Sequence, residues 1–144
     1  MKSELSARLP LLTSEIRKDQ RIILAFLFGS QASSTANRLS DVDIALLLSP
    51  DVARAQYLQV RLHYIAAFSS ILQTDRVDIA LLNTAPPLLA NEAIQGRLLF
   101  ERSPEARVKY IVDVQRKYLD LKYFYRIDAR YMRQRLQGGT FGKP

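Results

Sequence analysis

Short apolar runs bounded by polar residues recur through the first hundred positions of the chain. They occupy residues 22–28, 41–48 and 74–82, and a briefer run of the same kind occupies 97–101. An uninterrupted apolar run of this length is typical of a strand that is buried on both faces of a sheet. We therefore expect these segments to form the strands of one small sheet.

Between these runs, apolar residues return every three or four positions, which is the spacing of one helix face. This periodicity predicts helices over residues 5–19, 50–73, 88–95 and 104–136. Pro10 lies inside the first of them, where a proline can shift or split a helix. Strands interspersed with helices indicate an α/β (α+β) fold, in which a small sheet is backed by helices and followed by a C-terminal helix.

The length of 144 residues suits one domain with one core. Hydrophobic residues make up 48% of the chain and charged residues 24%, values that are close to the globular average and argue against disorder. We expect a single domain over residues 1–137, in which a basic helix occupies about 104–136. The small and polar segment 138–144 is typical of a flexible tail.

Residue usage limits the chemistry that the chain can carry out. It has no cysteine and a single histidine, His63, which removes thiolate zinc sites, cysteine nucleophiles and any reaction that needs two imidazoles. Because His63 lies between Leu62 and Tyr64 in a predicted helix, we interpret it as a surface or packing residue. Catalysis must therefore rest on carboxylates, hydroxyls, backbone amides and cations.

The formal net charge of +7 is concentrated near the C-terminal end. Residues 1–100 hold 10 Lys and Arg against 9 Asp and Glu, whereas residues 101–144 hold 11 against 5. A strongly basic segment indicates an anionic partner. The N-terminal region lacks an apolar stretch of signal-peptide length and the apolar runs are too short to span a bilayer, so we expect a cytoplasmic protein without a membrane partner.

Two carboxylates stand at the start of the second predicted strand. Side chains alternate along a strand, so Asp41 and Asp43 point to the same side of the sheet. Two carboxylates that lie so close repel each other unless a cation or a proton sits between them. With oxygen ligands only, the ion expected there is Mg²⁺ or Mn²⁺ rather than Zn²⁺.

Two further features belong with this pair. Asp78 precedes the apolar part of the third strand much as Asp43 precedes that of the second, so neighbouring strands would bring the two together. Asp75 is the competing candidate, but its place nearer the turn favours Asp78. After the first strand, Gly29 permits close backbone approach to a ligand, and Ser30 offers a hydroxyl and an amide to a phosphate chain.

Gly29 and Ser30, ten further residues, the Asp41-Val42-Asp43 sequence and the downstream Asp78 together resemble the signature of the DNA polymerase β-like nucleotidyltransferases. The short chain is similar to the minimal nucleotidyltransferase (MNT) group, in particular to the MntA-type adenylyltransferase antitoxins of HEPN/MNT toxin–antitoxin systems. The resemblance covers about residues 20–102, which would form the catalytic core.

The resemblance implies a nucleotidyltransferase fold with a small mixed β-sheet, and a role for each matched residue. Gly29 and Ser30 would hold the nucleotide triphosphate, and Asp41 and Asp43 would bind two Mg²⁺ ions, or Mn²⁺ in their place. Asp78 would bind the catalytic metal and help to activate the acceptor hydroxyl. In one respect the chain departs from the pattern: the loop after Ser30, residues 31–35, has no glycine where family members often have one.

The implied activity is transfer of AMP from ATP to a tyrosine of a cognate HEPN-domain RNase toxin, which blocks the toxin and predicts a hetero-oligomer of the two proteins. Two alternatives remain open at this stage. The chain could transfer a nucleotide to a small molecule or an RNA end, or it could be a non-catalytic antitoxin that neutralises its partner by binding.

The C-terminal segment mixes tyrosines with basic residues, a combination that also occurs in nucleic-acid-binding proteins. Its apolar and aromatic residues fall at helical spacing, and we expect these to pack on the sheet: Ile111, Val114, Tyr118, Leu121 and Tyr125. The basic residues would form a solvated or partner-facing side: Arg116, Lys117, Lys122, Arg126, Arg130 and Arg133. We therefore expect a docking surface for a protein rather than direct nucleic-acid binding.

Overall fold

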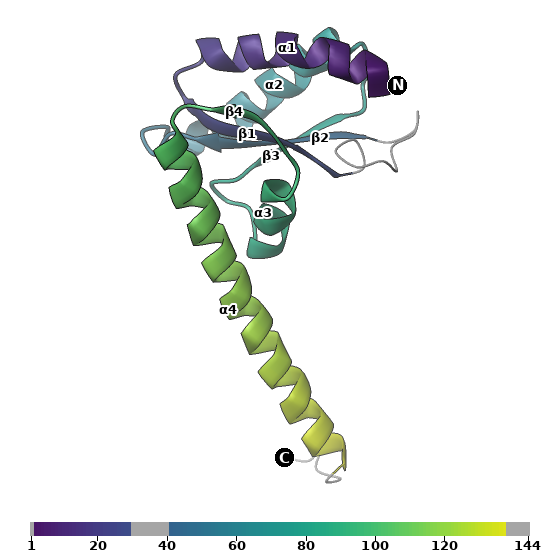
Figure 1. The fold of residues 1–144 in the computed structure, drawn as a ribbon, viewed down its shortest axis with the longest axis vertical. Coiled ribbons are helices and arrows are strands. Elements are labelled where there is room, and N and C mark those ends of the chain that lie inside the picture. Colours follow the sequence, from purple (N-terminus) through teal and green to yellow (C-terminus); the bar gives the residue numbers. More distant parts are fainter. Residues whose placement is uncertain (1, 30–40, 138–144) are drawn as a thin grey trace.

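The computed structural model describes residues 2–29 and 41–137 and shows a four-stranded sheet with helices on both faces (Figure 1). The loop 30–40, with Ser30 in it, and the predicted tail 138–144 lie outside the described residues. In chain order the elements are α1 (Lys2–Lys18), β1 (Ile22–Phe28), β2 (Val42–Leu48), the 3₁₀ turn η2 (Arg54–Gln56), α2 (Tyr57–Leu72), β3 (Val77–Leu81), α3 (Pro87–Ile94), β4 (Arg97–Glu101) and α4 (Pro104–Gln137).

The sheet is mixed, as the sequence predicts. Its strand order is β3-β2-β1-β4, with β1 antiparallel to both β2 and β4 and with β2 parallel to β3. The two central strands β1 and β2 are buried over most of their length, which explains their continuous apolar runs. This order leaves β3 and β4 as the two edges.

Each face of the sheet has its own core. Helices α1 and α2 cover one face, where Leu12, Ile16 and Phe68 are fully buried. Helix α3 and the first turns of α4 cover the other, where Ala93 is fully buried and Val114 is 4% exposed. Figure 1 shows the two layers on opposite sides of the strands.

The observed bounds confirm most of the predicted elements. The strands over 22–28 and 97–101 match the predicted residues, and those predicted over 41–48 and 74–82 are present but shorter. Helix α1 continues through Pro10. The proline lies on the exposed side of the helix, where water can satisfy the carbonyl that loses its amide donor.

The predicted start of the helix over 50–73 is wrong. Ser49 forms a tight turn, because its hydroxyl accepts a hydrogen bond from the Asp51 amide and its carbonyl accepts one from the Val52 amide. The 3₁₀ turn η2 follows, and the α-helix itself begins only at Tyr57.

The C-terminal helix packs on the body only through its first part. Val114 is buried, but Tyr125, which we expected on the sheet, is 57% exposed, so that expectation is wrong. A helix of 34 residues is about 50 Å long and outreaches the sheet, as Figure 1 shows. Among the described residues, no helix combines the length and the apolar character that a membrane span requires.

Candidate functional site

The strand register brings the predicted site residues to one end of the sheet. Phe28, the last residue of β1, is paired with Asp43 on β2, and Asp43 is paired with Asp78 on β3. Gly29 therefore follows directly after the residue that faces Asp43. Paired residues of neighbouring strands project to the same face, so the Asp43 and Asp78 side chains share the sheet face that α3 covers.

Gly29 and Asp43 are in close contact. Gly29 has a φ of +73°, a left-handed conformation that glycine adopts without steric cost. A Cβ on this residue would lie 2.5 Å from Oδ2 of Asp43, so the absent side chain leaves the space that the carboxylate occupies. The glycine is thus required both by the backbone conformation and by its neighbour.

Asp43 is the most enclosed of the three predicted carboxylates. It is half-buried, whereas the side chains of Asp41 and Asp78 are 63% and 59% exposed. Partial burial raises the pKa of Asp43, and the negative charges of Asp78, Asp41 and Glu92 raise it further. These four carboxylates therefore concentrate negative charge at one end of the sheet, an arrangement that a bound cation would relieve.

Glu92 was not identified from the sequence. It lies in α3, on an exposed position of the helix that packs over the Asp43 face. Nothing in its local sequence distinguishes it from any solvated helix residue, because its proximity to Asp43 arises only from the packing of α3 on the sheet.

Two arginines, also missed by the sequence analysis, border the acidic residues. Nη1 of Arg76 lies 4.0 Å from Oδ1 of Asp41. Nη2 of Arg61 donates a hydrogen bond of 2.9 Å to Oδ1 of Asp78, and its Nε donates one of 2.7 Å to the carbonyl of Ile79. The site therefore contains two positively charged guanidinium groups as well as the carboxylates.

An open cavity of about 560 Å³ lies beside the acidic residues and is lined by Asp41, Asp75, Arg76, Val77 and Asp78. Asp75 borders the cavity from the turn before β3, but the strand register pairs Asp43 with Asp78. The preference for Asp78 over Asp75 stays a prediction. The cavity gives a ligand direct access to Asp41 and Asp78 from solvent.

The chemistry of the donors fits a divalent cation such as Mg²⁺, because they are carboxylate oxygens that repel one another. Within residues 2–29 and 41–137, however, no three His, Cys, Asp or Glu side chains converge closely enough to hold a metal ion. Arg61 engages one oxygen of Asp78.

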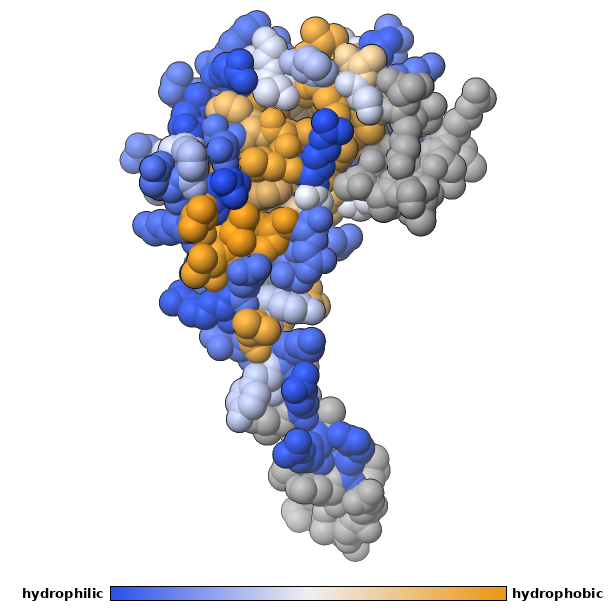
Figure 2. All heavy atoms as spheres, in the orientation of Figure 1, coloured by the Kyte–Doolittle hydropathy of each residue, from blue (hydrophilic) through white to orange (hydrophobic). Residues whose placement is uncertain are grey.

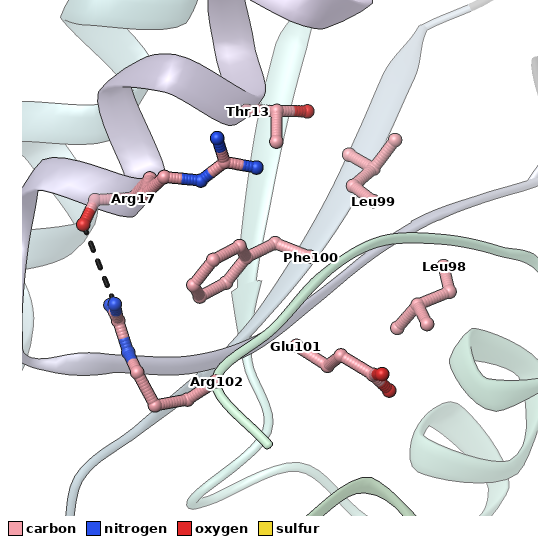
Figure 3. A pocket seen from close by; sticks show the side chains of 7 residues that line it. All are labelled: Thr13, Arg17, Leu98, Leu99, Phe100, Glu101 and Arg102. Carbon is pink, nitrogen blue, oxygen red and sulfur yellow. Dashed lines mark hydrogen bonds between the residues drawn. The ribbon is translucent and has the colours of Figure 1, made fainter. Parts of the chain in front are cut away.

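A second cavity, of about 460 Å³, lies between α1 and β4 (Figure 3). Its lining includes Arg17, whose carbonyl accepts a hydrogen bond from Arg102, and the apolar side chains of Leu98, Leu99 and Phe100. Because β4 and β3 are opposite edges of the sheet, this cavity is separate from the carboxylates. Glu101 is the one acidic residue among those that line it, so it is a poorer candidate for metal chemistry.

His63 is exposed on α2, with its ring in an edge-to-face arrangement against Tyr64 at a centroid distance of 5.0 Å. This placement confirms its interpretation as a surface and packing residue.

Comparison with known proteins finds similarity over most of the chain. The family described as "Polymerase beta, Nucleotidyltransferase" matches residues 12–105. The chloroplast chaperone ClpD of Arabidopsis thaliana is 30% identical over 122 residues, which are 81% of this chain, but the chain spans only 12% of the length of ClpD.

Several solved structures share the fold. A mutant of the toxin–antitoxin pair MntA–HpeT has a TM-score of 0.69 at 21% identity, covering 86% of this chain and 97% of that one. A tri-AMPylated Shewanella oneidensis HEPN toxin in complex with MNT antitoxin gives 0.66 at 19%, covering 92% and 98%. A toxin–antitoxin complex with AMP-PNP gives 0.64 at 20%, covering 91% and 97%.

Proposed function

Because the chain belongs to the polymerase beta nucleotidyltransferase family, we propose that it transfers AMP from ATP to a tyrosine hydroxyl of a HEPN-domain toxin. It thereby acts as the antitoxin of a cytoplasmic toxin–antitoxin pair. The observation that carries this proposal is the register that aligns Gly29, Asp43 and Asp78 at one end of the sheet. Its support from relatives is the fold shared with an MNT antitoxin in complex with an AMPylated HEPN toxin.

Each site residue has a distinct role in this reaction. Gly29 allows the backbone after β1 to approach the triphosphate, and Ser30 offers a hydroxyl and an amide to the same group. Asp41, Asp43 and Asp78 would hold two Mg²⁺ ions. When bound, these ions neutralise phosphate charge and align the reacting groups.

The bond changes follow from this placement. The tyrosine oxygen of the acceptor attacks the α-phosphorus of ATP, the bond from that phosphorus to the bridging oxygen breaks, and diphosphate leaves with the electron pair. The proton of the tyrosine hydroxyl passes to Asp78, which borders the open cavity and can be reached by a large acceptor. No histidine base is required, because a carboxylate can accept this proton.

Helix α4 supplies a surface that suits a protein acceptor. It projects from the body (Figure 1) and exposes large apolar side chains that lie on one stripe, with exposures between 52% and 65%: Val108, Val112, Leu119 and Tyr123. Arg126, Arg130 and Arg133 continue the same stripe at helical spacing. Figure 2 shows hydrophobic surface where α4 leaves the body and mainly hydrophilic surface farther along.

Transfer of label tests the proposal directly. The chain is incubated with ATP labelled at the α-phosphate, Mg²⁺ and a candidate HEPN-domain acceptor, and the label should appear on that protein. Asp43→Asn and Asp78→Asn should abolish transfer. Asp51→Asn, at an exposed turn after β2, and Asp75→Asn should retain it, which also tests the choice of Asp78 over Asp75.

Other outcomes identify the alternatives. Label on RNA or on a small molecule would keep the nucleotidyltransferase activity but change the acceptor. Tight association of the two proteins without any label would indicate a non-catalytic antitoxin and contradict the proposal.

A further inference from the structure

Arg61 connects the two faces of the sheet at the edge strand β3. It belongs to α2, which covers the face opposite to the carboxylates, yet its guanidinium reaches around β3 to Asp78. Two donors are engaged: Nε bonds to the Ile79 carbonyl at 2.7 Å, and Nη2 bonds to Oδ1 of Asp78 at 2.9 Å.

The position of β3 explains why this contact can form. As an edge strand, β3 presents part of its backbone to a side chain rather than to another strand. The Ile79 carbonyl fixes the guanidinium on rigid backbone, and the guanidinium in turn restricts the carboxylate of Asp78. A fork of donors in one plane makes arginine suited to such a double contact.

Without this contact, little would hold Asp78 in place. Its side chain is 59% exposed, and the nearby negative charge of Asp43 would favour rotamers that turn it toward solvent. Arg61 engages one carboxylate oxygen, and a carboxylate has a second with which it can bind a cation.

We propose that Arg61 is a positioning residue, which holds the Asp78 carboxylate beside Asp43 so that the two bind one divalent cation together with the nucleotide. The proposal rests on the proposed function of the site. It differs from a stabilising role, since an ion pair between side chains that are 43% and 59% exposed contributes little to folding. The effect should therefore appear in metal binding rather than in stability.

Arg8 provides a matched control for a purely structural arginine. Its Nη1 donates a hydrogen bond of 2.7 Å to the Ile71 carbonyl, and its Nη2 donates one of 3.3 Å to Oε1 of Gln73. Arg8 therefore makes the same pair of contacts, one to a backbone carbonyl and one to a side-chain oxygen, but it joins α1 to the end of α2 and touches no carboxylate.

The experiment measures binding of Mn²⁺ by electron paramagnetic resonance in the presence of AMP-PNP, for the wild type, Arg61→Gln, Arg61→Lys and Arg8→Gln. Arg61→Gln should weaken Mn²⁺ binding by about tenfold or more, as the loss of a group that orients a metal ligand does. The Mn²⁺ affinity of Arg61→Lys should lie between those of the wild type and Arg61→Gln, because an ammonium cannot make both contacts in one plane. Arg8→Gln should bind Mn²⁺ as the wild type does.

Thermal unfolding of the same variants separates folding from positioning, and the midpoints of Arg61→Gln and Arg8→Gln should fall by similar amounts. Equal Mn²⁺ affinity in the wild type and in Arg61→Gln would overturn the positioning role but leave the proposed function intact. A wild type that binds no Mn²⁺ with AMP-PNP would overturn both. Steady-state transfer by Arg61→Lys should require more Mg²⁺ for half-maximal rate while retaining its KM for the acceptor protein.

Discussion

The carboxylate of Asp43 fills the space that a side chain on Gly29 would need. The carboxylate Oδ2 of Asp43 lies where a Cβ on Gly29 would need to be, at 2.5 Å from it. Asp43 lies on β2, and Gly29 follows the last residue of the adjacent antiparallel strand β1 in a left-handed conformation. The conformation of Gly29 and the position of the carboxylate are therefore determined together.

Replacement of Gly29 by alanine tests this dependence. In Gly29→Ala the added methyl group strains the backbone by about 1 kcal/mol and must displace the Asp43 carboxylate as well. Affinity for AMP-PNP with Mn²⁺ should fall by about tenfold or more, as calorimetric titration would show. Unchanged affinity would mean that Asp43 can move without consequence, which contradicts the close coupling of the two residues.

Gln73 has a left-handed conformation for a different reason, because it is the C-terminal cap of α2, with a φ of 55°. A glycine there removes the strain of a side chain in this conformation. Gln73→Gly should therefore raise the free energy of unfolding by about 0.5–1 kcal/mol. The loss of the weak hydrogen bond that Arg8 donates to the Gln73 side chain reduces this gain. Urea denaturation measures the change, and AMP-PNP affinity should not alter. A decrease in stability would show that the Arg8 contact outweighs the backbone strain.

The strands were predictable because burial on both faces leaves an unbroken apolar run. Ile22–Phe28 matches the predicted bounds for this reason. Arg97–Glu101 also matches, although it is a partly exposed edge strand whose short apolar run is bounded by two charged residues. The predicted start of the second helix was wrong because a side-chain hydrogen bond, not apolar periodicity, sets this boundary. Ser49 forms a turn, and α2 begins only at Tyr57. The helical spacing of Tyr125 correctly indicated a helix. Spacing alone does not show where a long helix ceases to pack on the sheet, and Tyr125 is exposed.

Some residues of the candidate site could be predicted from the sequence and others could not. Asp41, Asp43 and Asp78 were predicted because each stands at a strand boundary, where sequence position translates directly into position on the sheet. Arg61 and Glu92 were not, because each lies on a helix and reaches the site through tertiary packing. Periodicity within a helix shows which residues share a face, but it does not reveal which strand that face meets.

The lowered pKa of Asp19 makes the stability of the fold depend on pH. Hydrogen bonds from Arg21 and from the Tyr64 hydroxyl, which lies 2.6 Å away, hold the pKa of Asp19 well below its usual range. A depressed carboxyl pKa stabilises the folded state above the unfolded pKa of about 4, and this contribution is lost as the pH falls below that value. Asp19→Asn should lower the free energy of unfolding at pH 7 by about 2 kcal/mol.

The difference between the wild type and Asp19→Asn should narrow as the pH is lowered from 5 toward 2. Chemical denaturation at a series of pH values measures it. A difference that stays constant over this range would show that the charge of Asp19 does not contribute to stability. Arg21→Gln offers a second check, because it removes the main contact that depresses the pKa and should reduce the pH dependence as well.

Tyr110 carries a buried hydroxyl for which the described residues provide no hydrogen-bond partner. Burial also raises the pKa of Tyr110 well above its usual value. Because an unsatisfied buried hydroxyl costs about 1–3 kcal/mol, Tyr110→Phe should leave stability unchanged or raise it by about 1 kcal/mol. Tyr64→Phe is the matched control, since it removes a hydroxyl that donates to Asp19, and it should be destabilising. A comparable loss in both variants would show that the Tyr110 hydroxyl has a partner in solution.

The stripe on α4 predicts which side of the helix meets the acceptor protein. Leu119 and Phe124 are 61% and 65% exposed, but five helical positions separate them, so they lie on different sides of the helix. Leu119 shares a side with Val108, Val112 and Tyr123, whereas Phe124 does not. Leu119→Asp should weaken binding of the HEPN protein by at least about 2 kcal/mol, the effect of a central apolar contact.

Phe124→Asp introduces the same charge at similar exposure, so it controls for the effect of a new negative charge on α4. It should bind the HEPN protein with nearly wild-type affinity in a calorimetric titration. Equal losses in both variants would mean that docking depends on the integrity or the net charge of the helix rather than on one side of it. Because the basic residues repel a second copy of α4, the same variants should leave the chain's own oligomeric state unaltered in sedimentation experiments.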